Sequence, residues 1–128
     1  TTAGGQEARW SPDGRAIVYL RNTGLWVIAP GGGAPRLVID TGDPAAPLTP
    51  LLAQWAPDGR AIYYKALDGD GRTSFWSISA EGGNPKLLVR FDDPARPSPR
   101  AEFATDGSRL YFTVAERESD IWRMELSP

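Results

Sequence analysis

The sequence predicts an all-β fold made of three repeated units, and two observations carry that prediction. One phrase occurs three times, as ARWSPDGRAIVYL at 8–20, AQWAPDGRAIYYK at 53–65 and AEFATDGSRLYFT at 101–113. Its aromatic position recurs at Trp10, Trp55 and Phe103, which lie 45 and 48 residues apart. A strand-rich repeat of about 40–50 residues is typical of β-propellers. We therefore expect propeller blades at approximately 6–41, 50–91 and 99–127.

Two further columns keep the same register. One consists of LWVI at 25–28, FWSI at 75–78 and IWRM at 121–124, and the other aligns GGGAPRLV at 31–38 with EGGNPKLLV at 81–89. All five tryptophans thus fall at repeat positions, which favours packing between blades over a carbohydrate or peptide groove. The expected blade core comprises Trp10, Trp26, Trp55, Trp76, Phe103 and Trp122.

Each unit contains short segments with the composition of strands. The second segment of each is rich in Ile, Val, Tyr and Leu, at 15–21, 60–66 and 108–114. Four consecutive apolar residues at 17–20 indicate a strand that is buried on both faces. No stretch keeps a helical period for long without Gly or Pro. The expected fold is an arc of a six-bladed-type propeller, with three four-stranded antiparallel blades of which the last lacks its outer strand.

A tight turn joins the first two strands of each unit. In SPDG, Pro12 presets φ, Asp13 tolerates the bridge region, and Gly14 can adopt a positive φ. This pattern is typical of a type I turn followed by a left-handed glycine. We assign the turn residues to structure rather than catalysis: Pro12, Asp13, Gly14, Pro57, Asp58, Gly59, Asp106 and Gly107.

With these motifs the chain resembles the WD40-like (PD40) repeat family of TolB-type β-propellers. The resemblance rests on WSPDGR, an apolar strand, a Trp strand, a GG turn and a Pro-Arg/Lys-Leu strand, and it covers roughly residues 6–126. It implies a non-catalytic scaffold that binds a protein or peptide in a bacterial periplasm or extracytoplasmic space. Similar propellers gate prolyl-oligopeptidase-type serine peptidases or serve as sensors of bacterial kinases and regulators, and these remain alternatives. FATDGS in the third unit departs from the motif, as expected of a terminal or diverged blade.

Charge and hydropathy argue against nucleic acid and membrane as partners. The 14 basic and 16 acidic residues are interspersed and give a net charge of −2, which disfavours nucleic-acid binding. There is no polybasic patch for a membrane surface. The longest apolar run is only a few residues, so we expect neither a transmembrane helix nor a signal peptide.

Chemistry is constrained by the absence of His and Cys. A Ser-His-Asp triad, a Cys-His pair, a disulfide and a His- or Cys-ligated metal cannot form within the chain. GGG at 31–33 precedes a strand and lacks the ending of a phosphate loop. LDGDGR at 67–72 starts like a calcium loop but has Ser79 where the loop requires Glu, which favours a solvated hairpin tip. We expect no catalytic residue, no metal and no cofactor.

Strand alternation predicts where a partner docks. The uniform tight turns lie at one end of the blades, and the longer, varied loops at 40–50, 66–74, 91–100 and 115–119 lie at the other. Variable loops on a rigid scaffold commonly carry function. The candidate residues at this loop face are Asp43, Asp68, Asp70, Asp92, Asp93, Arg96, Glu116, Arg117 and Glu118, against the alternative that these loops are only solvated connections.

The number of blades is itself informative, because closed propellers have about 4–8. Three blades leave two apolar faces without a neighbour. We expect either that two copies associate into a homodimeric six-bladed ring, or that the remaining blades belong to a parent chain of which this is a natural or engineered fragment.

Overall fold

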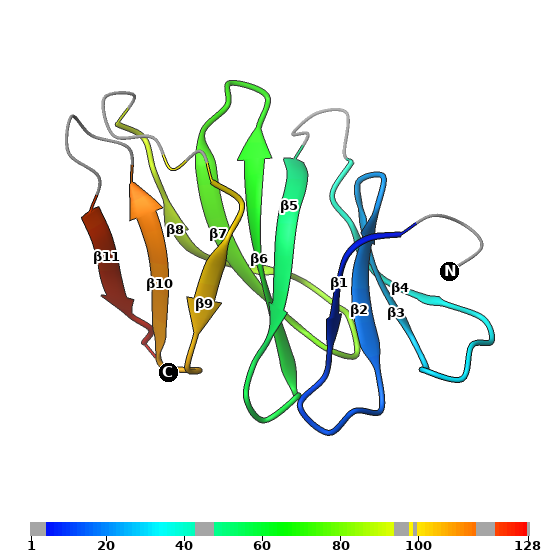
Figure 1. Ribbon diagram of the computed structural model, residues 1–128. Helices are drawn as coiled ribbons and strands as arrows, with labels where there is room; N and C mark the ends of the chain where they lie inside the picture. Colours follow the sequence, from blue (N-terminus) through cyan, green and yellow to red (C-terminus); the bar gives the residue numbers. More distant parts are fainter. Residues whose placement is uncertain (1–4, 43–47, 94–97, 99, 115–119, 128) are drawn as a thin grey trace.

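Figure 1 shows a computed structural model of the chain, which describes residues 5–42, 48–93, 98, 100–114 and 120–127. All regular secondary structure in those residues is β-strand, arranged in three sheets. The first sheet contains β1 (Gln6–Trp10), β2 (Ile17–Arg21), β3 (Gly24–Ile28) and β4 (Arg36–Asp40). The second contains β5 (Leu48–Trp55), β6 (Ala61–Asp68), β7 (Thr73–Ser79) and β8 (Lys86–Arg90). The third contains β9 (Phe103–Thr105), β10 (Arg109–Val114) and β11 (Asp120–Glu125).

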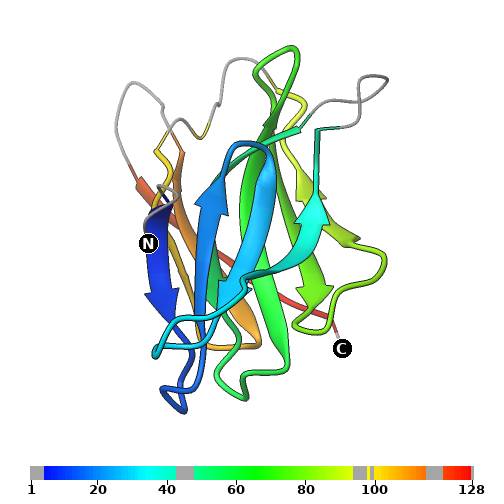
Figure 2. The same cartoon turned by 90° about the vertical axis from the view of Figure 1, so that its right-hand side faces the viewer.

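Every sheet is an antiparallel meander in which sequential strands are neighbours. The sheets follow one another across Figure 1 and pack face to face, as propeller blades do. Viewed from the side of the first sheet, its four strands stand in front of the second sheet (Figure 2). The sequence therefore predicted both the strand order and the three-stranded last sheet correctly.

The core lies in two layers, one at each junction between sheets. At the first junction the buried side chains are Val18, Leu20, Leu25, Val27, Val38, Ala53, Ile62, Tyr64, Ala66 and Ile78. At the second they are Leu52, Phe75, Phe103, Leu110, Phe112 and Val114. The middle strand β6 serves both layers, because successive side chains of a strand point to opposite faces. Tyr64 thus belongs to the first junction and its neighbour Tyr63 packs against the second.

The aromatic columns are buried unequally. Phe103 is buried, and Trp26, Trp55 and Trp76 are half-buried. The expectation of a core position is wrong for Trp10, which is 62% exposed, and for Trp122, which is 40% exposed. Trp10 lies on the face of the first sheet that points away from the second, so no described sheet covers it. Trp122 faces the second sheet but lines a hollow there.

Candidate binding face

The ends of the blades differ as strand alternation predicts. The turns between β1 and β2, β5 and β6, and β9 and β10 lie at the lower end in Figure 1, and the β6–β7 loop lies at the upper end. Two of the four expected loops are shorter than predicted, because Leu48–Trp55 is one strand and only four residues separate Asp68 from Thr73. Pro50 is accommodated within β5 at an irregularity in its pairing with β6.

The tight turns are built from their own side chains. Ser11 Oγ donates to Asp13 Oδ1 at 2.7 Å, and the amide of Arg15 donates to the same oxygen at 3.0 Å. These hydrogen bonds, that from Ser11 above all, hold the pKa of Asp13 below its usual value. Gly14 has φ of 72°, and its amide donates to the Ser11 carbonyl at 3.0 Å. The carboxylate of this turn is thus occupied by local structure.

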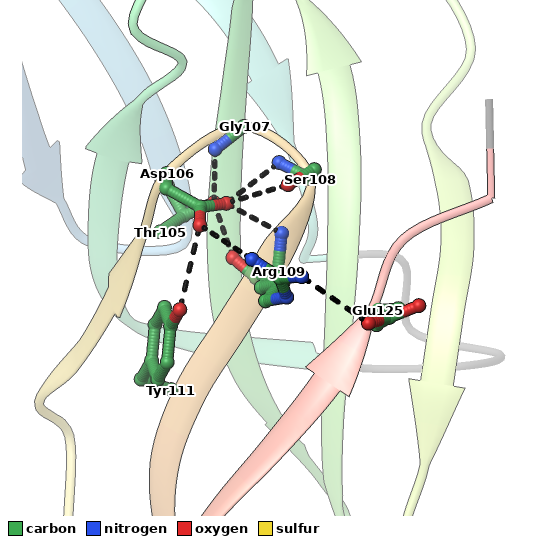
Figure 3. Close-up of polar contacts among 7 residues, drawn as sticks. All are labelled: Thr105, Asp106, Gly107, Ser108, Arg109, Tyr111 and Glu125. Atoms are coloured by element: carbon green, nitrogen blue, oxygen red, sulfur yellow. Dashed lines mark hydrogen bonds and ion pairs between the residues drawn. The ribbon is translucent and has the colours of Figure 1, made fainter.

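Figure 3 shows the polar network of the third turn, in which Thr105 stands where the other two turns have proline. Asp106 Oδ1 accepts hydrogen bonds from the amides of Ser108 and Arg109 at 2.9 and 2.7 Å. The hydrogen bond from the backbone amide of Ser108 is the main cause that lowers the pKa of Asp106. Arg109 in turn pairs with Asp106 and with Glu125, which ties the turn to β11. The third turn aspartate therefore also has a structural role.

At the opposite end an acidic hollow lies between the β6–β7 loop and the segment that follows β8. Its volume is about 320 Å³, and its lining brings together three of the predicted candidates, Asp70, Asp92 and Asp93. Arg72 is the basic residue of this lining, and Thr73 and Phe91 form its floor with Gly71. Residues more than twenty positions apart in the chain thus line one recess. We call this recess the acidic hollow.

Arg90, the last residue of β8, forms ion pairs with both sides of the acidic hollow. Arg90 pairs with Asp68 at 3.0 Å and with Asp92 at 3.3 Å. Asp68 Oδ1 also accepts hydrogen bonds from the backbone amides of Asp70 and Arg72, both at 2.9 Å. These hydrogen bonds from backbone amides, above all the one from Arg72, lower the pKa of Asp68. Asp68 therefore shapes the loop, whereas the Asp70 carboxylate makes no hydrogen bond or ion pair within the described residues.

A second hollow shares Phe91, Asp92 and Asp93 with the acidic hollow and lies between β8 and the third sheet. Its volume is about 350 Å³. Most of its lining is apolar and comes from both sheets: Val89, Phe91, Phe112, Val114, Trp122 and Met124. Arg90 and Arg123 complete it. We call it the apolar hollow. The two recesses together form an acidic and an apolar subsite on either side of one segment.

The remaining candidates, Asp43, Arg96, Glu116, Arg117 and Glu118, fall outside the described residues. Sequence reasoning missed the apolar hollow, because it assigned Trp122 to the packed core. Among the described residues the third sheet has three strands, so no outer strand covers Trp122.

Within the described part of the chain, no group of three or more His, Cys, Asp or Glu side chains could hold a metal ion. The same residues include no helix with the length and apolarity needed to span a membrane. The D-x-D-G segment is accounted for by the turn that Asp68 caps.

Comparison with known proteins decides the architecture. No protein-family model matches the chain, and no curated protein does. A solved protein described as TolB from Agrobacterium tumefaciens superposes with a TM-score of 0.66 at 20% identity, over 98% of this chain and 43% of that one. The chain is a partial β-propeller. A protein described as dipeptidyl aminopeptidase IV from Bacteroides ovatus gives a TM-score of 0.71 at 16% identity, over 93% of this chain and 22% of the other.

An acylaminoacyl peptidase gives a TM-score of 0.61 at 16% identity, and the match covers 97% of this chain and 25% of that protein. The propeller segment described above thus spans less than half the length of each of these three structures. At such identities the likeness establishes the fold, which the repeat columns had predicted.

Proposed function

We propose that this propeller segment is a non-catalytic scaffold that binds a protein or peptide at its loop face. The observation that supports it most directly is the pairing of the acidic hollow with the apolar hollow around Phe91, Asp92 and Asp93. A ligand that fits both has a basic side chain next to an apolar one. Short peptide segments offer that combination.

Each hollow contributes a different part of the recognition. Carboxylates at the rim of a recess attract a Lys or Arg side chain and determine its orientation more than its affinity. Affinity comes mainly from the desolvated apolar part, where aromatic side chains such as Trp122 and Phe91 give large contact areas. Arg90 lines the apolar hollow and pairs with Asp92, which lines both hollows.

A peptide titration tests this function. The probe is a glycine-flanked Lys-Phe-Arg peptide, and a Glu-Phe-Glu peptide of the same length serves as its charge-reversed control. We expect the basic peptide to shift the amide resonances of Gly71, Thr73 and Asp93 and to change tryptophan fluorescence through Trp122. No response, or an equal response to both peptides, would argue against the acidic hollow as a binding site.

A matched pair of variants locates the site. Asp70→Asn removes one charge from the acidic hollow and should weaken binding of the basic peptide about two- to fivefold, as loss of an exposed charge pair does. Glu81→Gln removes the same charge at the β7–β8 turn, at the opposite end of the blades, and should leave binding unchanged. If both variants weaken binding equally, the effect is one of net charge and the loop face is not the site.

The compartment forms part of the proposal. Similarity of the fold to a protein described as TolB supports a bacterial periplasmic or extracytoplasmic location. Fractionation of the native host with an antibody against this chain tests it, and recovery from the cytosol alone would contradict it.

Gating of a serine peptidase is the second candidate function. It is favoured by the match of these blades to segments of two structures described as peptidases. A hydrolase domain with a G-x-S-x-G motif encoded next to this segment would support it. A kinase or regulator domain in that position would support a sensor instead.

A further inference from the structure

The two outer faces of the arc carry side chains that are more exposed than those at the same repeat positions between sheets. Ile121 on β11 aligns with Leu25 and Phe75 in the LWVI, FWSI and IWRM segments. Leu25 and Phe75 are 0% exposed, whereas Ile121 is 78% exposed. Trp10 aligns with Trp55 and Phe103, and it is 62% exposed, whereas Trp55 is half-buried and Phe103 is 5% exposed.

The internal junctions show what these positions contact when they are covered. At the first junction the Trp55 indole lies against the first sheet, and its Nε1 donates to the Arg9 carbonyl at 3.0 Å. At the second, Phe103 meets the Phe75 ring edge-on with centroids 5.2 Å apart. Each junction therefore joins the Trp10-type position of one sheet to the Leu25-type position of the sheet before it. The arc ends with one half of such a junction at each side.

The exposed edge strands provide an internal comparison. Leu37 on β4 and Leu87 on β8 are 44% and 45% exposed. They occupy equivalent positions on the outermost strands of the first and second sheets, and the second sheet has a neighbour on each face. Their exposure is therefore a property of the edge. The exposure of Trp10 and Ile121 is instead a property of the two faces that no described sheet covers.

We propose that two copies of this chain dock head to tail through these faces. Trp10 of one copy takes, on the third sheet of the other, the place that Trp55 takes on the first sheet. Ile121 then lies in the same relation to Trp10 as Phe75 does to Phe103. A second copy is the fitting occupant because the two uncovered faces are the two halves of a junction that the chain already forms twice within itself.

Head-to-tail contacts close into a ring when the rotation per unit allows it. Two arcs of three sheets give six blades, which is within the range of about 4–8 found for closed propellers. The contact is then made twice, once at each side of the ring. This inference concerns the faces of the sheets and does not depend on peptide binding at the loop face.

Sedimentation velocity on the 128-residue chain at micromolar concentration is the first test. The expected mass is twice the 13.9 kDa of one chain. A monomer would overturn the proposal. Circular dichroism and the melting temperature confirm that each variant described below is folded, which is expected because both substituted side chains are largely exposed.

The variants Trp10→Ala and Ile121→Asp each disable one face. Each alone should raise the dimer dissociation constant about tenfold or more, as loss of a central aromatic or burial of a charge does. Leu87→Asp is the matched control and should leave the dimer intact. Dissociation by Leu87→Asp, or by only one of the two face variants, would contradict a head-to-tail contact.

Mixing the two face variants separates head-to-tail docking from any symmetric contact. In a mixed pair, the disabled faces of Trp10→Ala and Ile121→Asp meet each other at one side of the ring. The two unmodified faces then meet at the other side and form one intact junction. We expect the equimolar mixture to recover dimer mass that neither variant shows alone, and a mixture that stays monomeric would overturn the proposal.

Discussion

The indole Nε1 of Trp55 donates a 3.0 Å hydrogen bond to the carbonyl of Arg9, 46 residues earlier and in the preceding sheet. At the next junction the corresponding side chain is Phe103, which has no N–H to donate. There Gln54, at the position of Arg9, donates through Nε2 to the Phe103 carbonyl at 3.1 Å. The direction of the polar contact between sheets is thus reversed where the repeat replaces Trp with Phe.

Trp55→Phe should lower the free energy of unfolding by about 1 kcal/mol, because it removes the hydrogen bond to Arg9 and keeps an aromatic ring in place. The measurement is urea denaturation followed by far-ultraviolet circular dichroism. An unchanged midpoint for Trp55→Phe would show that the bond contributes nothing to stability.

Trp76→Ala should destabilise the chain by about 3–5 kcal/mol, as truncation of a packed aromatic does. Trp76 stacks on Tyr64 with ring centroids 6.4 Å apart, and its Nε1 donates to Ser74 Oγ at 2.8 Å. Leu87→Ala is the control, because Leu87 is an exposed side chain on the same sheet and its truncation should cost far less. Equal losses for the two variants in thermal denaturation would contradict the packing role of Trp76.

Gly59→Ala should destabilise by about 1 kcal/mol through the backbone alone. Gly59 has φ of 72°, and no atom lies within 4 Å of a Cβ placed there, so strain is the sole cost. Gly31→Ala is the matched control, since its Cβ also meets nothing within 4 Å and its φ is not positive. We expect Gly31→Ala to be neutral or slightly stabilising, and a loss equal to that of Gly59→Ala would contradict the turn assignment.

Lys65 should make stability rise between pH 7 and 9.5. It is fully buried between the second and third sheets, where Nζ donates to Ser98 Oγ at 2.7 Å and to the Arg100 carbonyl. Burial lowers its pKa from 10.5 to about 8. The folded chain therefore releases this proton near pH 8, whereas the unfolded chain keeps it until about pH 10.5. Below pH 8 both states carry the charge, and folding bears the full cost of burying it. The free energy of unfolding then rises as the pH increases from 8 toward 10.5.

The expected gain by pH 9.5 is about 2 kcal/mol, from 1.36 kcal/mol per pKa unit. The measurement compares the free energy of unfolding of the wild type and Lys65→Met across this range, because the difference cancels other titrating groups. A slope that Lys65→Met leaves unchanged would show that Lys65 is not its source.

Repetition explains why the fold could be read from the sequence. Strand composition, SPDG turns and aromatic columns recur in register, and each unit confirms the others. The chemistry of the turns is local: Asp13 and Asp106 accept hydrogen bonds from residues within three positions. Such contacts depend little on the rest of the chain.

The candidate site could be predicted only in part. Alternation of strand direction placed Asp70, Asp92 and Asp93 at one end of the blades, but it could not show that they line one recess. Nor could it show that Asp68 and Asp70 differ in their contacts. Asp68 pairs with Arg90 and accepts hydrogen bonds from two backbone amides, whereas the nearby Asp70 carboxylate makes no such contact within the described residues. Those distinctions depend on how two loops from different parts of the second sheet meet.

By itself, the sequence determined the strands, their order, their turns and the end of the blades at which the variable loops lie, because periodicity and turn chemistry act over a few residues. Only the tertiary structure decided which members of each column are covered. Trp10 and Trp55 have nearly the same local sequence and the same strand position, yet Trp10 is largely exposed and Trp55 packs on a neighbouring sheet. Burial depends on the surface that faces a side chain, and that surface comes from residues some 45 positions away.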